Sequence, residues 1–288
     1  MSHFLEEEED NVNVTPVNPL VNLAYLMATV GIVGAAIYGI SGIIATQLAV
    51  RMDTKTEEKI GAAMTEVLRT ATLPHDTRIS YLEGLLGELQ ADVAKTTLKA
   101  SSYPPLKVAI LDDDIENAMV AAGSYLFVTD GLLQSVETEN ELAFVLAHEL
   151  GHLHHRDPLK ALGRGLMWAT LNGLLGLGQG PTALTSAANL ASLSYSRNQE
   201  TAADDYALAL TVAHYQHGDY ALDFFERIQA QEFDLGALSK IAEWQQTHPL
   251  TDQRIQRLEK ALKDNGWPTV GQATPLPNGI ACPSFECE

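Results

Sequence analysis

Residues 20–50 contain no Asp, Glu, Lys or Arg, and this uncharged run restricts the possible folds more than any other part of the sequence. The run is 31 residues long, whereas about 20 residues of helix cross the hydrocarbon core of a bilayer. A soluble helix that is apolar on every side needs a large protein around it. A cleavable signal peptide does not fit, because such peptides begin with basic residues and have a shorter apolar region. We therefore predict a transmembrane helix over residues 20–50 that contacts the lipid bilayer.

The residues before this run are acidic and include no Lys or Arg. So polar a segment cannot bury enough apolar surface to fold, and we expect residues 1–19 to lack fixed structure. Inside the predicted membrane helix, Gly31, Ala35 and Gly39 recur at intervals of four. This spacing favours close packing against a membrane-protein partner or a second copy, although small residues also occur in helices that cross the membrane alone.

A second motif lies in the middle of the chain, where His148 and His152 flank a short segment that includes Glu149. On a helix, residues at i and i+4 share one face, so both imidazoles can bind one zinc ion. Glu149 is then placed to act as a general base toward a water molecule. Thr138 predicts the start of this helix as its N-cap, and Asp157 before a proline predicts its end.

A catalytic zinc ion usually takes three protein ligands, so a third donor is needed. Glu200 is the best candidate, because a second amphipathic helix begins near residue 198 and carries Glu200 and Asp204 on one face. We predict that Glu200 binds the metal and that Asp204 accepts a hydrogen bond from a ligand histidine, which fixes the tautomer of that histidine. The alternative is that these acids only favour the helix dipole.

Together these motifs resemble the zinc endopeptidase family that includes HtpX, the CAAX prenyl proteases and the mitochondrial Oma-type protease. The likeness covers about residues 75–262 and depends on ordered segments. Ala121 and Ala122 depart from it, because many relatives have Pro-Gly there. The matching segments are residues 116–133, the helix with His148 and His152, residues 195–204 and residues 247–255.

The resemblance implies further site residues. His248 and Arg254 would stabilise the oxyanion formed during peptide hydrolysis; a loop His-Pro dipeptide and a surface arginine are the alternatives. The strand predicted over residues 124–129 would be an edge strand that pairs with an extended polypeptide substrate. The substrate-binding residues expected around it are Asn117, Ala118, Gly123, Ser124 and Tyr125.

Composition and order of elements set the remaining limits. With 37 acidic and 18 basic residues the net charge is −19, which argues against a nucleic-acid partner, because phosphate binding needs clustered Lys and Arg. Helical patterns over residues 53–100, a strand at residues 108–111 and the two zinc helices predict an α+β fold: a mainly helical, zincin-like metalloprotease domain with a small sheet. We place this domain at residues 51–265 and a loose, Pro- and Gly-containing tail at residues 266–288.

Residues 165–196 form another uncharged interval, interrupted by several glycines and Pro181. Each half is too short to span a bilayer, so we expect a helical hairpin that packs in the core or touches the membrane surface. Such a hairpin could cover the active-site cleft. The tail after Trp267 is the second candidate for a cover.

Two signals disagree about the side of the membrane on which the domain lies. Basic residues follow the membrane helix and are absent before it, which favours a cytoplasmic domain. Cys282 and Cys287, the only two cysteines, suit either a small disulfide in an oxidising compartment or two free thiols. Single-anchor relatives face away from the compartment of synthesis. The resemblance therefore favours the periplasmic side of a bacterial inner membrane for this single-pass protein.

From these observations we predict a membrane-anchored zinc endopeptidase with one Zn²⁺ per chain, which cleaves polypeptides in membrane or envelope protein quality control. The first alternative is a catalytically quiet scaffold or binding subunit of a membrane complex, which the intact set of motifs disfavours. The second is a prenyl-protein protease. Those relatives need several membrane helices, and only one is predicted here.

Overall fold

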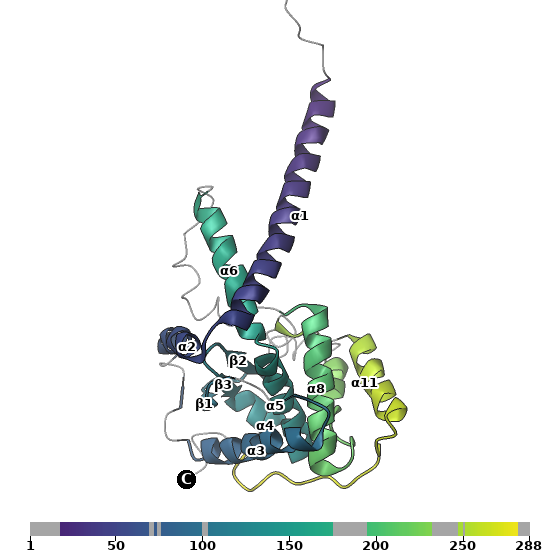
Figure 1. Ribbon diagram of the computed structural model, residues 1–288. Coiled ribbons are helices and arrows are strands. Elements are labelled where there is room, and N and C mark those ends of the chain that lie inside the picture. The colour runs from purple at the N-terminus through teal and green to yellow at the C-terminus, as the bar shows by residue number, and fades with distance from the viewer. Residues whose placement is uncertain are drawn as a thin grey trace, which may run out of the picture.

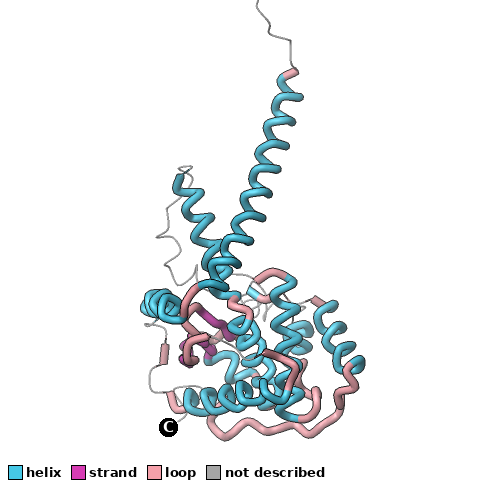
Figure 2. The backbone as a smooth tube through the Cα atoms, viewed as in Figure 1, coloured by secondary structure: helices cyan, strands magenta, loops and turns pink. Residues whose placement is uncertain are grey.

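One long helix projects from a mainly helical body that contains a three-stranded sheet (Figures 1 and 2). The predicted fold class is therefore confirmed. Most of the predicted acidic N-terminus, the middle of the predicted hairpin and both cysteines lie outside the described residues. The computed structural model describes residues 18–68, 72–73, 76–99, 103–174, 195–231, 247–249 and 251–281.

Helix α1, Pro19–Arg51, is the projecting helix. The side chain of Asn18 caps it by accepting a hydrogen bond from the backbone N–H of Leu20, and proline suits the first turn because its missing N–H needs no partner there. Over Pro19–Ile44 this helix is long and apolar enough to cross a membrane, and many of its large apolar side chains are exposed. The predicted apolar N-terminal helix is therefore present.

The sheet contains β1 (Lys107–Leu111), β2 (Ala118–Ala121) and β3 (Tyr125–Thr129) in the order β1-β3-β2. β1 runs parallel to β3, and β2 runs antiparallel to it. The prediction that residues 124–129 form an edge strand is wrong, because β3 pairs on both sides. A tight turn at Gly123 and Ser124, with φ values of 82° and 59°, folds β2 back onto β3, so β2 is an edge of the sheet instead.

The core lies between the sheet and the helices that pack around it. α3 (Arg78–Asp92) buries Leu82, Leu85, Leu86 and Leu89, and the short 3₁₀ helix η2 (Val93–Lys95) follows it directly. α5 (Glu139–His154) and α8 (Arg197–Tyr215) make the most extensive helix pair. A Cβ on Gly151 would lie 2.9 Å from the Cα of Ala203, so glycine is what allows these two helices to approach so closely. The other elements of the body are α2 (Thr54–Leu68), α4 (Asp130–Ser135), α9 (Asp223–Gln231) and α11 (Asp252–Asp264).

The end of α5 differs from the prediction. The N-cap is Thr138 as expected, but α5 ends at His154, and Asp157 begins a new helix, α6 (Asp157–Leu174), rather than closing the old one. Arg156 makes the turn between them with φ of 57°. Proline is tolerated in the first turn of a helix, which is why the Asp-Pro pair can open α6. α6 packs beside α1 (Figure 1).

The predicted loose tail is wrong for the residues that are described. Beyond α11 the chain runs along the body to residue 281 (Figure 1). The backbone N–H of Glu139 donates to the carbonyl of Thr274 over 2.9 Å, and Ile280 is 4% exposed. The bond to Glu139 lies at the first turn of α5, far along that helix from His148 and His152. The described tail therefore does not cover the histidines.

Candidate metal centre

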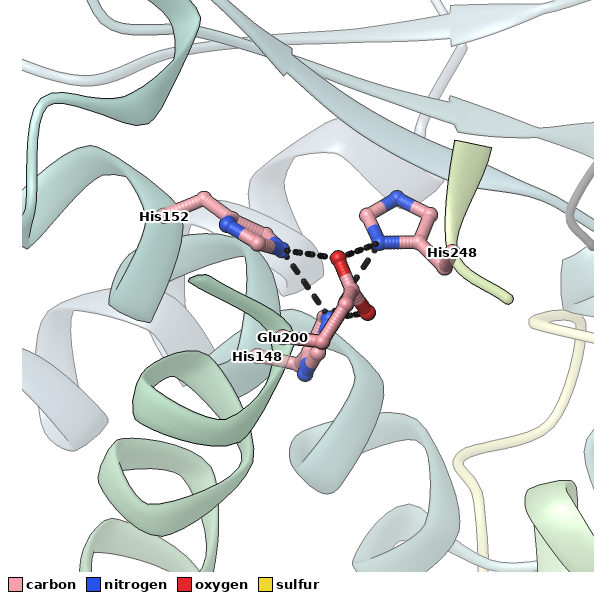
Figure 3. Close-up of side chains that lie close together, drawn as sticks. All are labelled: His148, His152, Glu200 and His248. Carbon is pink, nitrogen blue, oxygen red and sulfur yellow. Dashed lines mark hydrogen bonds and ion pairs between the residues drawn. The ribbon is translucent and has the colours of Figure 1, made fainter. Parts of the chain in front are cut away.

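Four buried side chains converge between α5 and α8: His148, His152, Glu200 and His248 (Figure 3). One ligand atom from each lies within 4.8 Å of the others. The two α5 histidines lie one turn apart with their Nε2 atoms 3.1 Å from each other. Glu200 enters from the first turn of α8, which Ser196 holds in place as the N-cap of a capping box. His248 comes from the segment before α11.

The spacing of these donors suits a tetrahedral metal ion. Zinc–ligand bonds of about 2.0–2.1 Å give donor–donor edges of about 3.3 Å in a tetrahedron. Here Glu200 Oε1 lies 3.4 Å from His152 Nε2 and 3.2 Å from His248 Nδ1. His148 Nε2 lies 3.3 Å from His248 Nδ1 and 3.5 Å from the other oxygen of Glu200. These distances, with all four ligand atoms within 4.8 Å of one another, suit side chains that hold one metal ion.

Each α5 histidine meets a buried carboxylate on the side away from the donor cluster. Asp204 Oδ1 lies 3.2 Å from His148 Nδ1, which is the position predicted for it. Asp157 Oδ2 lies 3.0 Å from His152 Nδ1 and was not predicted as a site residue. A carboxylate at Nδ1 keeps the proton there and leaves Nε2 free to bind a metal. Asp157 and Asp204 are both fully buried, so these contacts are shielded from solvent.

The electrostatics of the cluster favour a positive charge. Burial by itself lowers the pKa of His148, but Asp204 and Glu200 outweigh burial and raise it to about 9. Burial likewise raises the pKa of Glu200, and the three surrounding histidines reverse this and bring it far below its usual range. A site that holds a proton this strongly attracts a metal cation for the same reason.

Glu149 lies beside the donor cluster but is not one of its four donors. Its side chain is fully buried and faces the backbone of Val120 in β2, and His248 Nε2 lies 3.6 Å from its Oε1. Burial raises the pKa of Glu149, and His248 and His148 partly oppose the rise. A buried carboxylate with a raised pKa is suited to accept a proton from a third group.

Arg254 is paired with carboxylates, whereas a donor to an oxyanion would have N–H groups free to reach the substrate. Its Nε and one terminal nitrogen donate to Asp204 over 3.0 and 2.8 Å, and its other terminal nitrogen lies 2.9 Å from Glu200. The same nitrogen donates to the carbonyl of Pro249. Two buried carboxylates thus draw the guanidinium behind the cluster, where it orients Asp204 and Glu200.

Tyr195, like Asp157, belongs to the site but was not predicted from the sequence as a site residue. Its ring stacks on that of His152, with 4.0 Å between centroids and 19° between planes, and its backbone N–H donates to the carbonyl of Thr247. Burial and the charges of Glu149 and Asp157 raise the pKa of Tyr195 well above its ordinary value, so the hydroxyl stays protonated. In the sequence, Tyr195 directly precedes Ser196, the N-cap of α8, and this position close to Glu200 was the available signal that it belongs to the site.

The five predicted substrate-binding residues divide into two groups. Asn117 and Ala118 lie at the start of β2, the edge strand. Gly123 and Ser124 form the turn under α2, where Gly123 packs directly against Gly61, so this turn is covered. Tyr125 is half-buried in β3, and Lys107 lies over its ring.

Residues 86–262 match peptidase family M48, and this match covers well over half of the 288 residues. The chain belongs to this family. The M48 region includes α5, α8 and the segment with His248, which together supply all four donors of the metal cluster. The predicted resemblance to HtpX and the Oma-type protease is therefore confirmed.

Individual M48 relatives agree with this assignment. A protease HtpX homolog of Aeropyrum pernix is 39% identical over 116 residues, which are 34% of this chain and 35% of that protein. The mitochondrial metalloendopeptidase OMA1 of Schizosaccharomyces pombe is 30% identical over 60% of this chain and 52% of its own length. A protease HtpX homolog of Campylobacter concisus is 28% identical over 59% of this chain and 74% of its own length. The chain thus spans about a third to a half of the first two relatives.

Proposed function

We propose that this chain is a membrane-anchored zinc endopeptidase that hydrolyses peptide bonds in unfolded or damaged polypeptides. The observation that carries the proposal is the fully buried carboxylate of Glu149, whose pKa is raised by burial and which lies beside a cluster of four metal-ligand side chains. Membership of the M48 family supports the reaction class. The names of the HtpX and OMA1 relatives support an endopeptidase, and protein quality control is the role that the resemblance favours.

Zinc fits the donor set better than a hard cation, because imidazole nitrogens and one carboxylate at tetrahedral spacing are its usual ligands. When bound, zinc acidifies water and polarises a carbonyl group. His148, His152 and Glu200 would hold it, with their orientation fixed by Asp157 and Asp204. Glu149 would take a proton from water and pass it to the leaving amine of the cleaved peptide.

His248 would stabilise the oxyanion rather than act as a fourth permanent ligand. A catalytic site keeps one coordination position open, and a fourth permanent protein ligand would close it. The His248→Gln variant should therefore retain zinc but lose turnover, by about a hundredfold or more. Zinc content and peptide hydrolysis measured on the same preparation decide this. A variant that loses its zinc would make His248 a ligand instead.

An extended substrate would lie along β2, the sheet edge closest to Glu149. Val120 of β2 is among the groups that act on the pKa of Glu149, so this strand borders the proposed general base. Edge strands offer free backbone N–H and C=O groups, which can bind a polypeptide of any sequence by β-augmentation. This suits a protease whose substrates share an unfolded state rather than a sequence.

The exposed apolar face of α1 supports a bilayer anchor, and we place the catalytic domain on the periplasmic side of a bacterial inner membrane. Protease added to intact spheroplasts should then digest the domain and leave the acidic N-terminus protected. Cys282 and Cys287 should react with maleimide only after reduction. A protected domain with two free thiols would reverse the orientation.

The reaction itself is tested with the purified full-length chain in detergent and unfolded casein as substrate. Wild-type protein should cleave casein, lose activity to a chelator and recover it with zinc. Glu149→Gln should reduce turnover at least about a hundredfold, the lower end of general-base effects. Equal turnover of wild type and Glu149→Gln would refute the proposal, and a zinc-loaded protein without activity on any unfolded substrate would favour the scaffold alternative.

A further inference from the structure

A cavity of about 470 Å³ lies where α1 meets the catalytic body, outside the metal centre. Three helices that are far apart in sequence form its walls. α1 contributes its C-terminal half, α6 its first turns and α8 its N-terminal turn. The lining residues are Gly39, Gly42, Ile43, Gln47, Lys160, Arg164, Ser196 and Gln199.

The charge of this cavity is opposite to that of the whole chain. Lys160 and Arg164 lie one helical turn apart on α6, in a protein whose net charge is −19. Lys160 is held by Asp157, with 3.0 Å between Nζ and Oδ1. Arg164 forms no ion pair with the carboxylates of the described residues, although it lies close enough to lower the pKa of Tyr195. The cavity therefore presents a guanidinium that an anion can bind.

Its depth along α1 matches the headgroup layer of a bilayer. The hydrocarbon core is about 30 Å thick and a helix rises about 1.5 Å per residue, so about 20 residues cross it. Counted from Pro19, where the apolar stretch begins, that distance ends near Gly39. The cavity residues Gly39 to Gln47 lie at the C-terminal end of the apolar stretch Pro19–Ile44, where α1 would pass from the hydrocarbon through the headgroup region to the catalytic body.

We infer that this cavity binds the headgroup of an anionic phospholipid, with Arg164 and Lys160 on the phosphate. A guanidinium and an ammonium on one helix face can bind one phosphate with charge-assisted hydrogen bonds. Gly39 leaves room on the α1 side, because a Cβ there would meet no atom within 4 Å. The acyl chains would follow the exposed apolar side chains of α1 on the N-terminal side of Gly39, such as Ile32 and Val33, which a free phosphate ion could not use.

The proposed headgroup site is connected to the predicted metal ligand His152 through Asp157. Lys160 contacts one oxygen of Asp157, and the other oxygen of Asp157 contacts His152. The lipid and the metal centre thus share α6 as a common wall. This inference depends on the proposed membrane anchoring but not on peptidase activity, so its test measures lipid binding, and its failure is distinct from a failure of catalysis.

The test uses the full-length chain in detergent, with Glu149→Gln as the background so that the protein cannot digest itself. Native mass spectrometry measures retention of phosphatidylglycerol, phosphatidylcholine and inorganic phosphate in separate titrations. Phosphatidylglycerol should bind at least about tenfold more tightly than phosphatidylcholine, and Lys160→Gln with Arg164→Gln should weaken it about thirtyfold. Equal affinity for the two lipids would overturn the inference, as would phosphate binding as tightly as the lipid.

Two further variants keep the result interpretable. Arg164→Gln alone leaves the Lys160–Asp157 pair in place and should still weaken phosphatidylglycerol about fivefold. Gly39→Leu narrows the cavity without changing its charge and should weaken it as well. The matched control is Arg51→Gln with Lys55→Gln, which removes two exposed cations beside the membrane but outside the cavity. If this control lost as much affinity for phosphatidylglycerol as the cavity variants, the effect would come from general surface charge, and the proposed site would be wrong.

Discussion

Asp157 acts on the metal centre without being a candidate ligand. It lies 3.0 Å from His152 Nδ1 and is fully buried, so its charge fixes the orientation of that ring in a medium where water cannot compete. Asp204 has the same relation to His148. Each predicted histidine ligand therefore has its own carboxylate, one from the start of α6 and one from α8.

The Asp157→Asn variant should bind zinc about ten- to a hundredfold more weakly than the wild type, as is usual when the partner of a ligand histidine is changed. Competition with a chelator of known zinc affinity measures this. Asp205→Asn is the matched control, because the Asp205 side chain is 57% exposed and contacts Arg257 rather than a histidine. Unchanged zinc affinity in Asp157→Asn would show that the contact with His152 does not orient a ligand.

Among the elements, α2 depends on one glycine for its position. A Cβ on Gly61 would lie 2.2 Å from the carbonyl oxygen of Ala122, a backbone atom that can move only with the β2–β3 turn. Gly61→Ala should therefore destabilise the protein by about 1–3 kcal/mol. Gly84→Ala, on an exposed position of α3 with no atom within 4 Å, should stabilise it by up to about 1 kcal/mol. Thermal unfolding in detergent compares the two, and equal midpoints would contradict this packing.

The segment after α11 is expected to stabilise the body rather than gate it. Truncation after Gly266 removes Ile280 from the core and the backbone bond between Glu139 and Thr274. Burial of one isoleucine alone is worth about 1.5–3 kcal/mol, so the truncated protein should unfold at a clearly lower temperature. Its turnover at low temperature should not exceed that of the full chain. Higher turnover with unchanged stability would instead identify this segment as a lid.

Across the whole molecule, the sequence predicted those features that local geometry determines. His148 and His152 converge because i and i+4 share a helix face, and the same spacing brings Glu200 and Asp204 to one side of α8. The apolar helix follows from composition alone. These inferences needed no knowledge of which segments lie next to each other.

The features that were missed or wrong depend on contacts between distant segments. Asp157 meets His152 only because Arg156 turns the chain with a positive φ and starts α6. Arg254 lies 50 residues from Asp204 in sequence, so its ion pair could not be read from spacing. The edge position of β2 depends on β1 pairing with β3, and strand order is set by the whole sheet.

The most direct test of this account is the zinc content of the purified full-length chain, measured on the wild type, Glu149→Gln and Glu200→Gln. We expect one zinc ion per chain in the wild type and in Glu149→Gln, because Glu149 serves as base and not as ligand. Glu200→Gln should hold markedly less zinc after dialysis, because it loses the charged ligand of the set. Wild-type protein without zinc, or Glu200→Gln that retains it fully, would contradict the metal centre proposed for this chain.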